Sequence, residues 1–169
     1  MVYLVIFLAI ISRFIPHLPN LGVITALAIF SAAYLPKKQA LVIPLAARFI
    51  SDLIIGFFSW PLMIAVYASH LSGFVFGRWI KKENNLNRWL KIVFSGFGSA
   101  MIFFFVTNFA FLYPEYSHNW SGIIQSYINA LPFLRGTLLG DIGYTVGIFS
   151  AYELAKYLVT KKTLAQQKI

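Results

Sequence analysis

The sequence predicts an all-α protein, a bundle of six transmembrane helices, and three observations support this fold class. Of the 169 residues, 59% are hydrophobic and 11% are charged, whereas soluble domains are roughly 45–50% apolar and about 25% charged. The mean hydropathy is +0.75 over the whole chain. Long apolar runs alternate with short segments that hold most of the charges. So few charges exclude an ordinary soluble domain, and the high hydrophobicity excludes a disordered chain.

The charge balance and the absence of cysteine narrow the possible functions further. Without cysteine the chain has no disulfide, thiolate metal site or cysteine nucleophile. The net charge is +9, from fourteen Lys and Arg against five Asp and Glu. In a soluble chain this excess would favour nucleic-acid binding. Here the basic residues lie between apolar runs, which is typical of membrane proteins, so we expect a lipid bilayer and no nucleic acid as partner.

Six apolar segments approach the ~20 residues that a membrane-spanning helix needs. The first begins at the N-terminus, which lacks the basic segment and cleavage site of a signal peptide. Five prolines lie at segment boundaries, where a residue without an amide hydrogen disturbs a helix least. Pro44 lies inside the third segment and is predicted to kink it. The predicted spans are residues 2–15, 21–35, 40–58, 62–80, 90–113 and 133–159.

The segment 121–131 differs from the spans because it is too short and too polar to cross a membrane. Its apolar residues recur at helical spacing. We expect a short amphipathic helix on the outer surface, ended by Pro132, which turns the chain into the last span. A surface loop without a role is the alternative interpretation.

The distribution of charge predicts the topology. The loop 113–125 contains Glu115 and no Lys or Arg, which predicts an outer loop and cytoplasmic N- and C-termini. Residues 1–160 are then one transmembrane domain and 161–169 a basic cytoplasmic tail of a multi-pass protein in the bacterial inner membrane. Tryptophans at both expected interfaces agree. Eleven of the fourteen basic residues follow spans two, four and six: Lys37, Lys38, Arg78, Lys81, Lys82, Arg88, Lys91, Lys156, Lys161, Lys162 and Lys168.

Small residues recur at every fourth position in three spans. Such stripes let helix backbones approach closely inside a membrane. We favour internal packing of the bundle over a docking face for a partner subunit. The stripes are Ala28 and Ala32 in span two, Ala65, Ser69, Gly73 and Gly77 in span four, and Gly143, Gly147, Ala151 and Ala155 in span six.

Four ionisable residues fall inside the predicted spans: Arg48 and Asp52 in the third, Arg135 and Asp141 in the sixth. Each charge near a helix centre costs roughly 2.5–3.5 kcal/mol, so these side chains must pair or face water. Arg48 and Asp52 have the i, i+4 spacing of an ion pair on one helix face. Arg135 and Asp141 lie about 9 Å apart along a helix axis, so each needs another partner. Both carboxylates are predicted in the outer half of the membrane.

Other polar residues gather at that depth, which predicts a small-molecule site in an apolar cavity open to the outside. An ion-pair lattice that only fixes helix register is the alternative. We expect His70, in the fourth span, to be a hydrogen-bonded structural histidine rather than a proton relay. No spacing of His, Asp or Glu indicates a metal site, and no cofactor is expected. The predicted site residues are Asn20, Arg48, Asp52, Asn108, Arg135, Asp141 and Tyr144.

Four stretches carry a resemblance to a known family: residues 19–30, Ser51-Asp52 with Gly56, Asn108-Phe109, and residues 132–141. They resemble an uncharacterised family of bacterial integral membrane proteins that is similar to the S components, the substrate-capturing subunits of energy-coupling factor transporters. The resemblance implies six helices, a small-molecule substrate and a scaffold and ATPase complex as partner. S components meet the scaffold through Ala-x-x-x-Ala in the first helix, where this chain has Ala9 and Ser12. The site residues that the resemblance implies are Asn20, Asp52, Asn108, Arg135 and Asp141.

These observations favour a non-enzymatic protein that binds or transports a small molecule. An intramembrane aspartyl protease is a second hypothesis, because Asp52 and Asp141 lie at similar predicted depth and residues 139–141 resemble the end of the Gly-x-Gly-Asp signature. Leu138 stands where that signature has Gly. A catalytic pair also shares one proton, whereas Arg48 and Arg135 would keep both carboxylates ionised. A structural or assembly protein without a ligand is the third hypothesis.

Overall fold

A computed structural model describes residues 1–12, 22–81 and 86–166 of the chain. Over these ranges the protein has six α-helices, one short 3-10 helix and no strand, which confirms the all-α prediction. The helices follow the six predicted spans in order. They are α1 (Val2–Ser12), α2 (Ile24–Tyr34), α3 (Lys37–Ile55), α4 (Trp60–Ile80), α5 (Leu86–Thr107) and α6 (Trp120–Gln166), with η1 (Ala110–Leu112) after α5.

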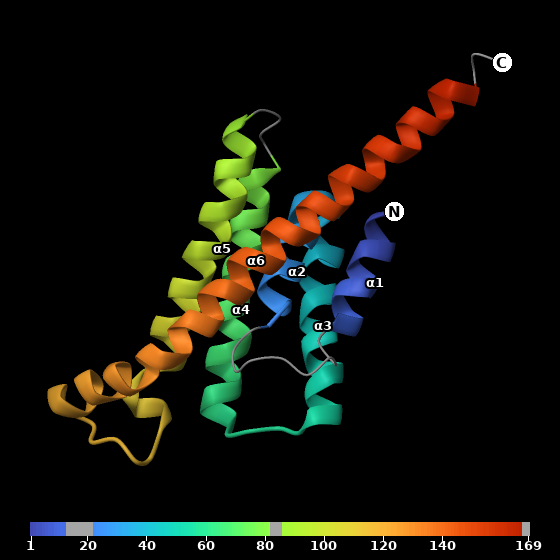
Figure 1. Ribbon diagram of the computed structural model, residues 1–169. Coiled ribbons are helices and arrows are strands. Elements are labelled where there is room, and N and C mark those ends of the chain that lie inside the picture. The colour runs from blue at the N-terminus through green and yellow to red at the C-terminus, as the bar shows by residue number, and fades with distance from the viewer. Residues whose placement is uncertain (13–21, 82–85, 167–169) are drawn as a thin grey trace.

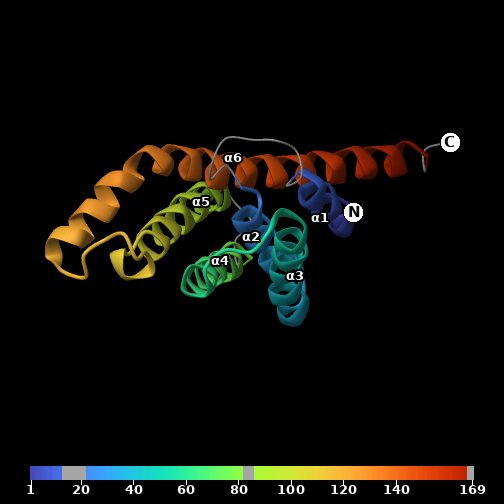
Figure 2. The same cartoon turned by 90° about the horizontal axis from the view of Figure 1, so that it is seen from below.

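Successive helices run in opposite directions along the bundle, and the two ends of the chain lie at the same end of it (Figure 1). The last helix, α6, crosses the other helices obliquely, and its C-terminal part extends beyond them (Figures 1 and 2). The turn between α3 and α4 and the segment between α5 and α6 lie at the opposite end.

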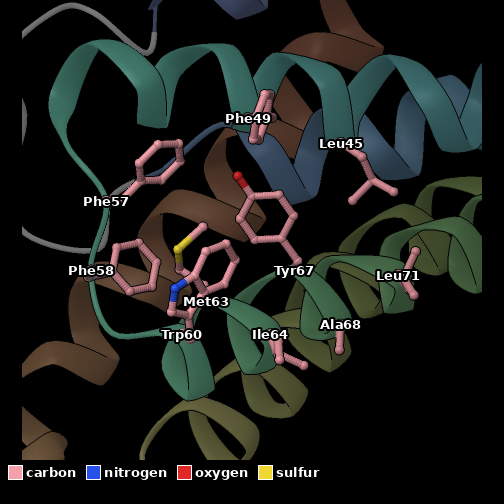
Figure 3. Close-up of a pocket in the computed structure, with 10 residues that line it drawn as sticks. All are labelled: Leu45, Phe49, Phe57, Phe58, Trp60, Met63, Ile64, Tyr67, Ala68 and Leu71. Atoms are coloured by element: carbon pink, nitrogen blue, oxygen red, sulfur yellow. The ribbon is translucent and has the colours of Figure 1, made fainter.

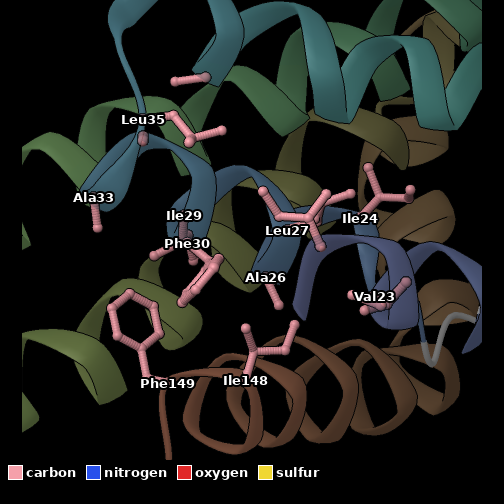
Figure 4. Packing of buried hydrophobic residues seen from close by; sticks show 14 of the residues in the cluster. Val23, Ile24, Ala26, Leu27, Ile29, Phe30, Ala33, Leu35, Ile148 and Phe149 are labelled. Carbon is pink, nitrogen blue, oxygen red and sulfur yellow. The ribbon is translucent and has the colours of Figure 1, made fainter. Parts of the chain in front are cut away.

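The core of the protein is built around α2, which packs against α1, α3, α4, α5 and α6. Ten of its eleven residues, Ile24 to Ala33, are buried, and a helix that is apolar on all sides belongs in such a central position. Its largest core side chain, Phe30, is fully buried and meets Phe149 of α6 edge to face, with 5.3 Å between ring centroids. Figure 4 shows Ile148 and Phe149 of α6 beside the α2 side chains.

The small-residue stripe of span four is used for internal packing, as predicted. A Cβ atom added at Gly73 would lie 2.8 Å from Ala28 Cβ, and one added at Gly77 would lie 2.2 Å from the Ile29 carbonyl oxygen and 2.6 Å from Ala32 Cβ. Backbone approach this close needs glycine on α4 and alanine on α2. The stripe therefore fixes how α2 and α4 pack.

The prediction of internal packing is wrong for the stripe of span six. Gly143 and Gly147 are exposed, and an added Cβ atom would meet nothing within 4 Å at either position. These residues instead border a groove of about 260 Å³ beside Ala9 and Ser12 of α1. Repeated small residues allow close packing without requiring it.

The predicted break at Pro132 is also wrong, because residues 121–131 and the last span form one continuous helix of 47 residues. Figure 2 shows the orange part of α6, which contains Pro132, bending relative to the red part. A proline inside a helix removes one amide donor and displaces a carbonyl group, which bends a helix that packing holds on both sides. The same helix continues through Lys161 and Lys162 to Gln166, so the predicted basic tail begins as helix.

Two helices of the described chain are long and apolar enough to cross a membrane: α4 and residues 87–107 of α5. The apolar helices α1 and α2 are shorter. Large apolar side chains also cover the surface of α4, where Trp60 is 75% and Ile64 68% exposed. Contiguous exposed apolar surface marks contact with lipid or another partner, so these observations indicate membrane association.

The close α2–α4 contact yields a stability test at Gly77. We expect Gly77→Ala to lower the free energy of unfolding by about 1–3 kcal/mol, because the new methyl group overlaps the backbone of α2. Gly143→Ala is the matched control, since open space surrounds that position and alanine favours a helix by up to about 1 kcal/mol. Thermal unfolding of the two variants in detergent, followed by circular dichroism, measures the difference. Equal destabilisation of both variants would contradict the assigned contact.

Candidate functional site

A groove of about 630 Å³ lies between α3 and α4. The two helices are joined by a four-residue segment, and Gly56 begins it with a φ of 115°, which glycine adopts readily. The walls are almost entirely apolar, as Figure 3 shows. The lining residues are Leu45, Phe49, Phe57, Phe58, Trp60, Met63, Ile64, Tyr67, Ala68 and Leu71.

A polar network lies at the α3 side of this groove. Arg48 Nε donates to Asp52 Oδ2 at 2.7 Å, which confirms the predicted i, i+4 ion pair. Tyr67, one of the groove residues, donates its hydroxyl hydrogen to the same Oδ2 at 2.9 Å, and Figure 3 shows this hydroxyl directed toward α3. The Asp52 side chain is only 2% exposed. The network therefore binds α3 to α4 and places polar atoms beside apolar walls.

The guanidinium group of Arg48 connects this network to the aromatic walls. Its central carbon lies 5.8 Å from the ring centroid of Phe58 and 6.0 Å from that of Tyr67. At these distances a cation is attracted to the faces of both rings. Arg48 thus has two roles: it neutralises a buried carboxylate and orders two residues that line the groove.

Asp141 belongs to a different cluster. It is buried on α6 and hydrogen-bonds with Thr25 of α2, and Thr25 Oγ1 lies 3.1 Å from Nδ1 of His70 on α4. The interactions described for Asp141 and for Asp52 involve no common residue. Among the described residues the two carboxylates thus have different hydrogen-bond partners, whereas the sequence interpretation placed them in one recess.

Arg135 lies in neither cluster. Its side chain is exposed, and the described part of the chain contains no ion pair for it. Six residues make about one and two-thirds turns of a helix, so Arg135 and Asp141 point in different directions from α6. The prediction that Arg135 joins a recess with Asp141 is wrong for this reason.

Asn108 and Tyr144 occupy two further places. Asn108 lines a small polar pocket of about 170 Å³ beyond the end of α5 and donates to the Phe104 carbonyl oxygen at 2.8 Å. Tyr144 is half-buried at the groove between α1 and α6. The remaining predicted residue, Asn20, lies outside the described residues. Of the seven predicted site residues, the structure thus brings together Arg48 and Asp52.

A hydrogen bond fixes the position of Tyr113, which lines the small pocket near Asn108. The Tyr113 hydroxyl donates to the Thr107 carbonyl oxygen at 2.6 Å, and burial, with Glu115 as a weaker second cause, raises the pKa of Tyr113 above its usual value. Tyr113 therefore stays protonated and keeps donating. These bonds tie the connection between α5 and α6 to the end of α5.

Sequence reasoning missed Tyr67 and one interhelical cluster. Arg88 of α5 forms an ion pair with Glu153 of α6 at 2.8 Å, and Tyr34 of α2 donates to the same Glu153 oxygen at 2.9 Å and accepts a hydrogen bond from Arg88. The sequence contains only a weak signal for this cluster. Each of the few charges in an apolar chain needs a partner, but residue spacing identifies only partners on the same helix.

Among the described residues, no group of three His, Asp or Glu side chains lies close enough to hold a metal ion. The arrangement around the α3–α4 groove is suited to binding, since an apolar cavity with a few fixed polar atoms is the usual form of a small-molecule site.

Comparison with known proteins identifies a family for this chain. Residues 1–164 match the model of a family of unknown function, DUF6580. No curated protein and no solved structure matches the chain.

The Arg48–Asp52–Tyr67 network predicts an ordered series of stabilities. We expect Asp52→Asn to cost roughly 3 kcal/mol, because it leaves a half-buried guanidinium group without its buried counter-charge. Tyr67→Phe is expected to cost about 1 kcal/mol, since Asp52 keeps Arg48 as donor. Chemical unfolding in detergent measures both changes.

Asn108→Ala is the control for this series, because Asn108 bonds a carbonyl oxygen of its own helix. We expect the variant to fold like the parent, with a loss within about 1 kcal/mol. If Asn108→Ala lost as much stability as Asp52→Asn, the ion pair would contribute no more to stability than the Asn108 hydrogen bond does.

Proposed function

The chain belongs to the DUF6580 family, and we propose that it is a multi-pass membrane protein that binds a small, mostly apolar molecule in the groove between α3 and α4. The observation that carries this proposal is the 630 Å³ apolar groove beside the Arg48–Asp52–Tyr67 network. Known ligand pockets have volumes of about 300–1,000 Å³ and combine apolar walls with a few placed polar groups.

The arrangement of charges and tryptophans supports a membrane position for the whole bundle. Trp60 and Trp120 begin α4 and α6 at one end, while Trp79 and Trp89 lie near the end of α4 and the start of α5 at the other. Most basic residues of the sequence, including Lys161 on α6, lie at or beyond this second end of the bundle. Tryptophan at both interfaces and basic residues on the cytoplasmic side are the pattern of multi-pass proteins.

The groove suggests the chemistry of its ligand. Ten lining residues offer aromatic and aliphatic surface, which favours an apolar body. The Tyr67 hydroxyl uses its hydrogen for Asp52, so its oxygen still accepts a hydrogen bond. Arg48 uses Nε for Asp52, and its remaining N–H groups are donors beside the Phe58 ring. We therefore propose a molecule with one hydrogen-bonding group on an apolar body.

A role in transport is the second part of the proposal. It rests on the sequence resemblance to substrate-capturing S components, which act with a scaffold and an ATPase. Binding in the groove and capture for transport are separable, because the first needs this chain alone and the second needs partner subunits.

The contacts of the aspartates favour binding over intramembrane proteolysis. Asp52 Oδ2 accepts hydrogen bonds from both Arg48 and Tyr67, and the hydrogen-bond partner of Asp141 is Thr25. An aspartyl protease needs two carboxylates that share one proton. The two aspartates here have different partners, so a purely binding role accounts better for their surroundings.

Occupancy of the groove is tested by filling it. We expect Ala68→Trp to reduce retention of a co-purified small molecule by at least tenfold, because an indole ring takes the space between α3 and α4. Val75→Trp is the matched control, since Val75 lies on the same helix, is 66% exposed and does not line the groove. Native mass spectrometry of gently purified protein measures retention, and solvent extraction identifies the molecule.

Each result bears on the proposal. A metabolite retained by the parent and by Val75→Trp but lost from Ala68→Trp supports it. Retention that is equal in both variants, or only phospholipid and detergent in the extract, would overturn it.

Topology is tested with introduced cysteines, which are unique because the chain has none. We expect Ser117→Cys, in the exposed segment before α6, to react with an impermeant maleimide in intact cells. Lys162→Cys, exposed near the C-terminal end of α6, should react only after permeabilisation. Labelling of both positions in intact cells would be incompatible with the proposed orientation.

A further inference from the structure

Three buried polar side chains connect three helices at the centre of the bundle. Thr25 of α2 hydrogen-bonds to Asp141 of α6, and its Oγ1 lies 3.1 Å from Nδ1 of His70 on α4. Their exposed fractions are 3% for Thr25, 4% for Asp141 and 6% for His70. The threonine hydroxyl thus bridges a carboxyl group and an imidazole that are 71 positions apart in the sequence.

Asp141 is the unusual member of this group. Its Oδ2 is buried without a hydrogen-bond partner in the described structure, and no cationic side chain of the described residues pairs with it. A buried carboxylate with a single donor pays a large desolvation cost, which a bound proton removes. A metal cation would need several more oxygen ligands, whereas a proton needs none.

We propose that Asp141, Thr25 and His70 form a proton-binding site in which Thr25 passes one proton between the carboxyl group of α6 and the imidazole of α4. This site goes beyond the proposed function and does not depend on an occupant of the α3–α4 groove.

The transfer balances within the three side chains. In one state the Asp141 carboxyl O–H donates to Thr25 Oγ1, and the Thr25 hydroxyl donates to His70 Nδ1. The Asp141 proton moves to Thr25 as the Thr25 proton moves to His70, which leaves a carboxylate and an imidazolium. The hydrogen bonds then run in reverse, from His70 through Thr25 to Asp141. Threonine serves both states because its hydroxyl donates and accepts.

Among the described residues, the groups that pack against this site from α3 and α5 are not titratable. From α5 the Phe103 ring lies 5.6 Å from the His70 ring, and Gly96 packs against the backbone of Asp141. From α3 the residues beside His70, which share a small cavity with it, are apolar: Ala40, Leu41, Pro44 and Leu45. Within the described residues, Asp141 and His70 are therefore the two groups of this site that exchange protons.

This inference revises the expectation that His70 is only structural. A lone interior histidine gives no reason to expect proton exchange. The bridge to a second buried ionisable group gives that reason, and it depends on α2 bringing Thr25 between α4 and α6.

Infrared spectroscopy of the purified chain in detergent, titrated with pH, tests the proposal. We expect the C=O band of a protonated carboxyl group in the parent at neutral pH and its complete loss in Asp141→Asn. Glu115→Gln, which removes an exposed carboxyl group, is the matched control and should keep the band. Isotope labelling of the aspartates sharpens the assignment, since Asp52 and Asp141 are the two aspartates of the chain.

The bridging role of Thr25 has its own readout. The nitrogen chemical shifts of the His70 ring, measured by NMR, should change over the same pH range as the Asp141 carboxyl band in the parent and in Thr25→Ser. In Thr25→Val, which keeps the side-chain shape but removes the hydroxyl, the two changes should no longer coincide.

Two outcomes would overturn the proposal: a carboxyl band that is identical in the parent and Asp141→Asn, or a His70 titration that Thr25→Val leaves unchanged. If Asp141→Asn does not fold, the infrared pH titration of the isotope-labelled parent is the deciding measurement. Absence of a protonated aspartate band over the whole pH range would then refute the site.

Discussion

The contact between α2 and α4 is the constraint on which the other features depend. Gly73 and Gly77 let the backbone of α4 lie directly against α2, so α2 is enclosed by its neighbours and almost all of its residues are buried. Dispersion forces act only over short distances. Between α2 and α4 they act largely between backbone atoms rather than between long side chains. Because the two backbones are so close, Thr25 lies within hydrogen-bond distance of His70.

Each interhelical polar cluster fixes the relative position of helices that the apolar core alone would not fix. Asp52 with Tyr67 joins α3 to α4, Thr25 joins α2 to α4 and α6, and Glu153 joins α6 to α2 and α5. Apolar side chains fill volume but accept many similar registers, whereas a hydrogen bond is lost when a helix shifts by one residue. The polar residues thus select one packing arrangement, and the groove between α3 and α4 is a consequence of it.

Local patterns predicted much of the fold and little of the site. The number and order of the helices follow from apolar runs, and the Arg48–Asp52 pair follows from helical spacing. Pairing over long sequence separation, as between Arg88 and Glu153, depends on how helices are placed and leaves no local signal. Pro132 was misread because a proline weakens a helix locally while packing of the whole helix decides whether it continues. Arg135 was assigned to the wrong place because the prediction used its depth in the membrane and did not consider which face of α6 it lies on.

The length of α6 has a mechanical consequence. Forty-seven residues at 1.5 Å each give a rod of about 70 Å, more than twice the roughly 30 Å of a hydrocarbon core. In the proposed orientation this bent helix reaches water on both sides, and it connects the polar pocket near Asn108 with the lysines at its far end. Because Glu153 joins α6 to α2 and α5, a tilt of α6 would also displace these two helices.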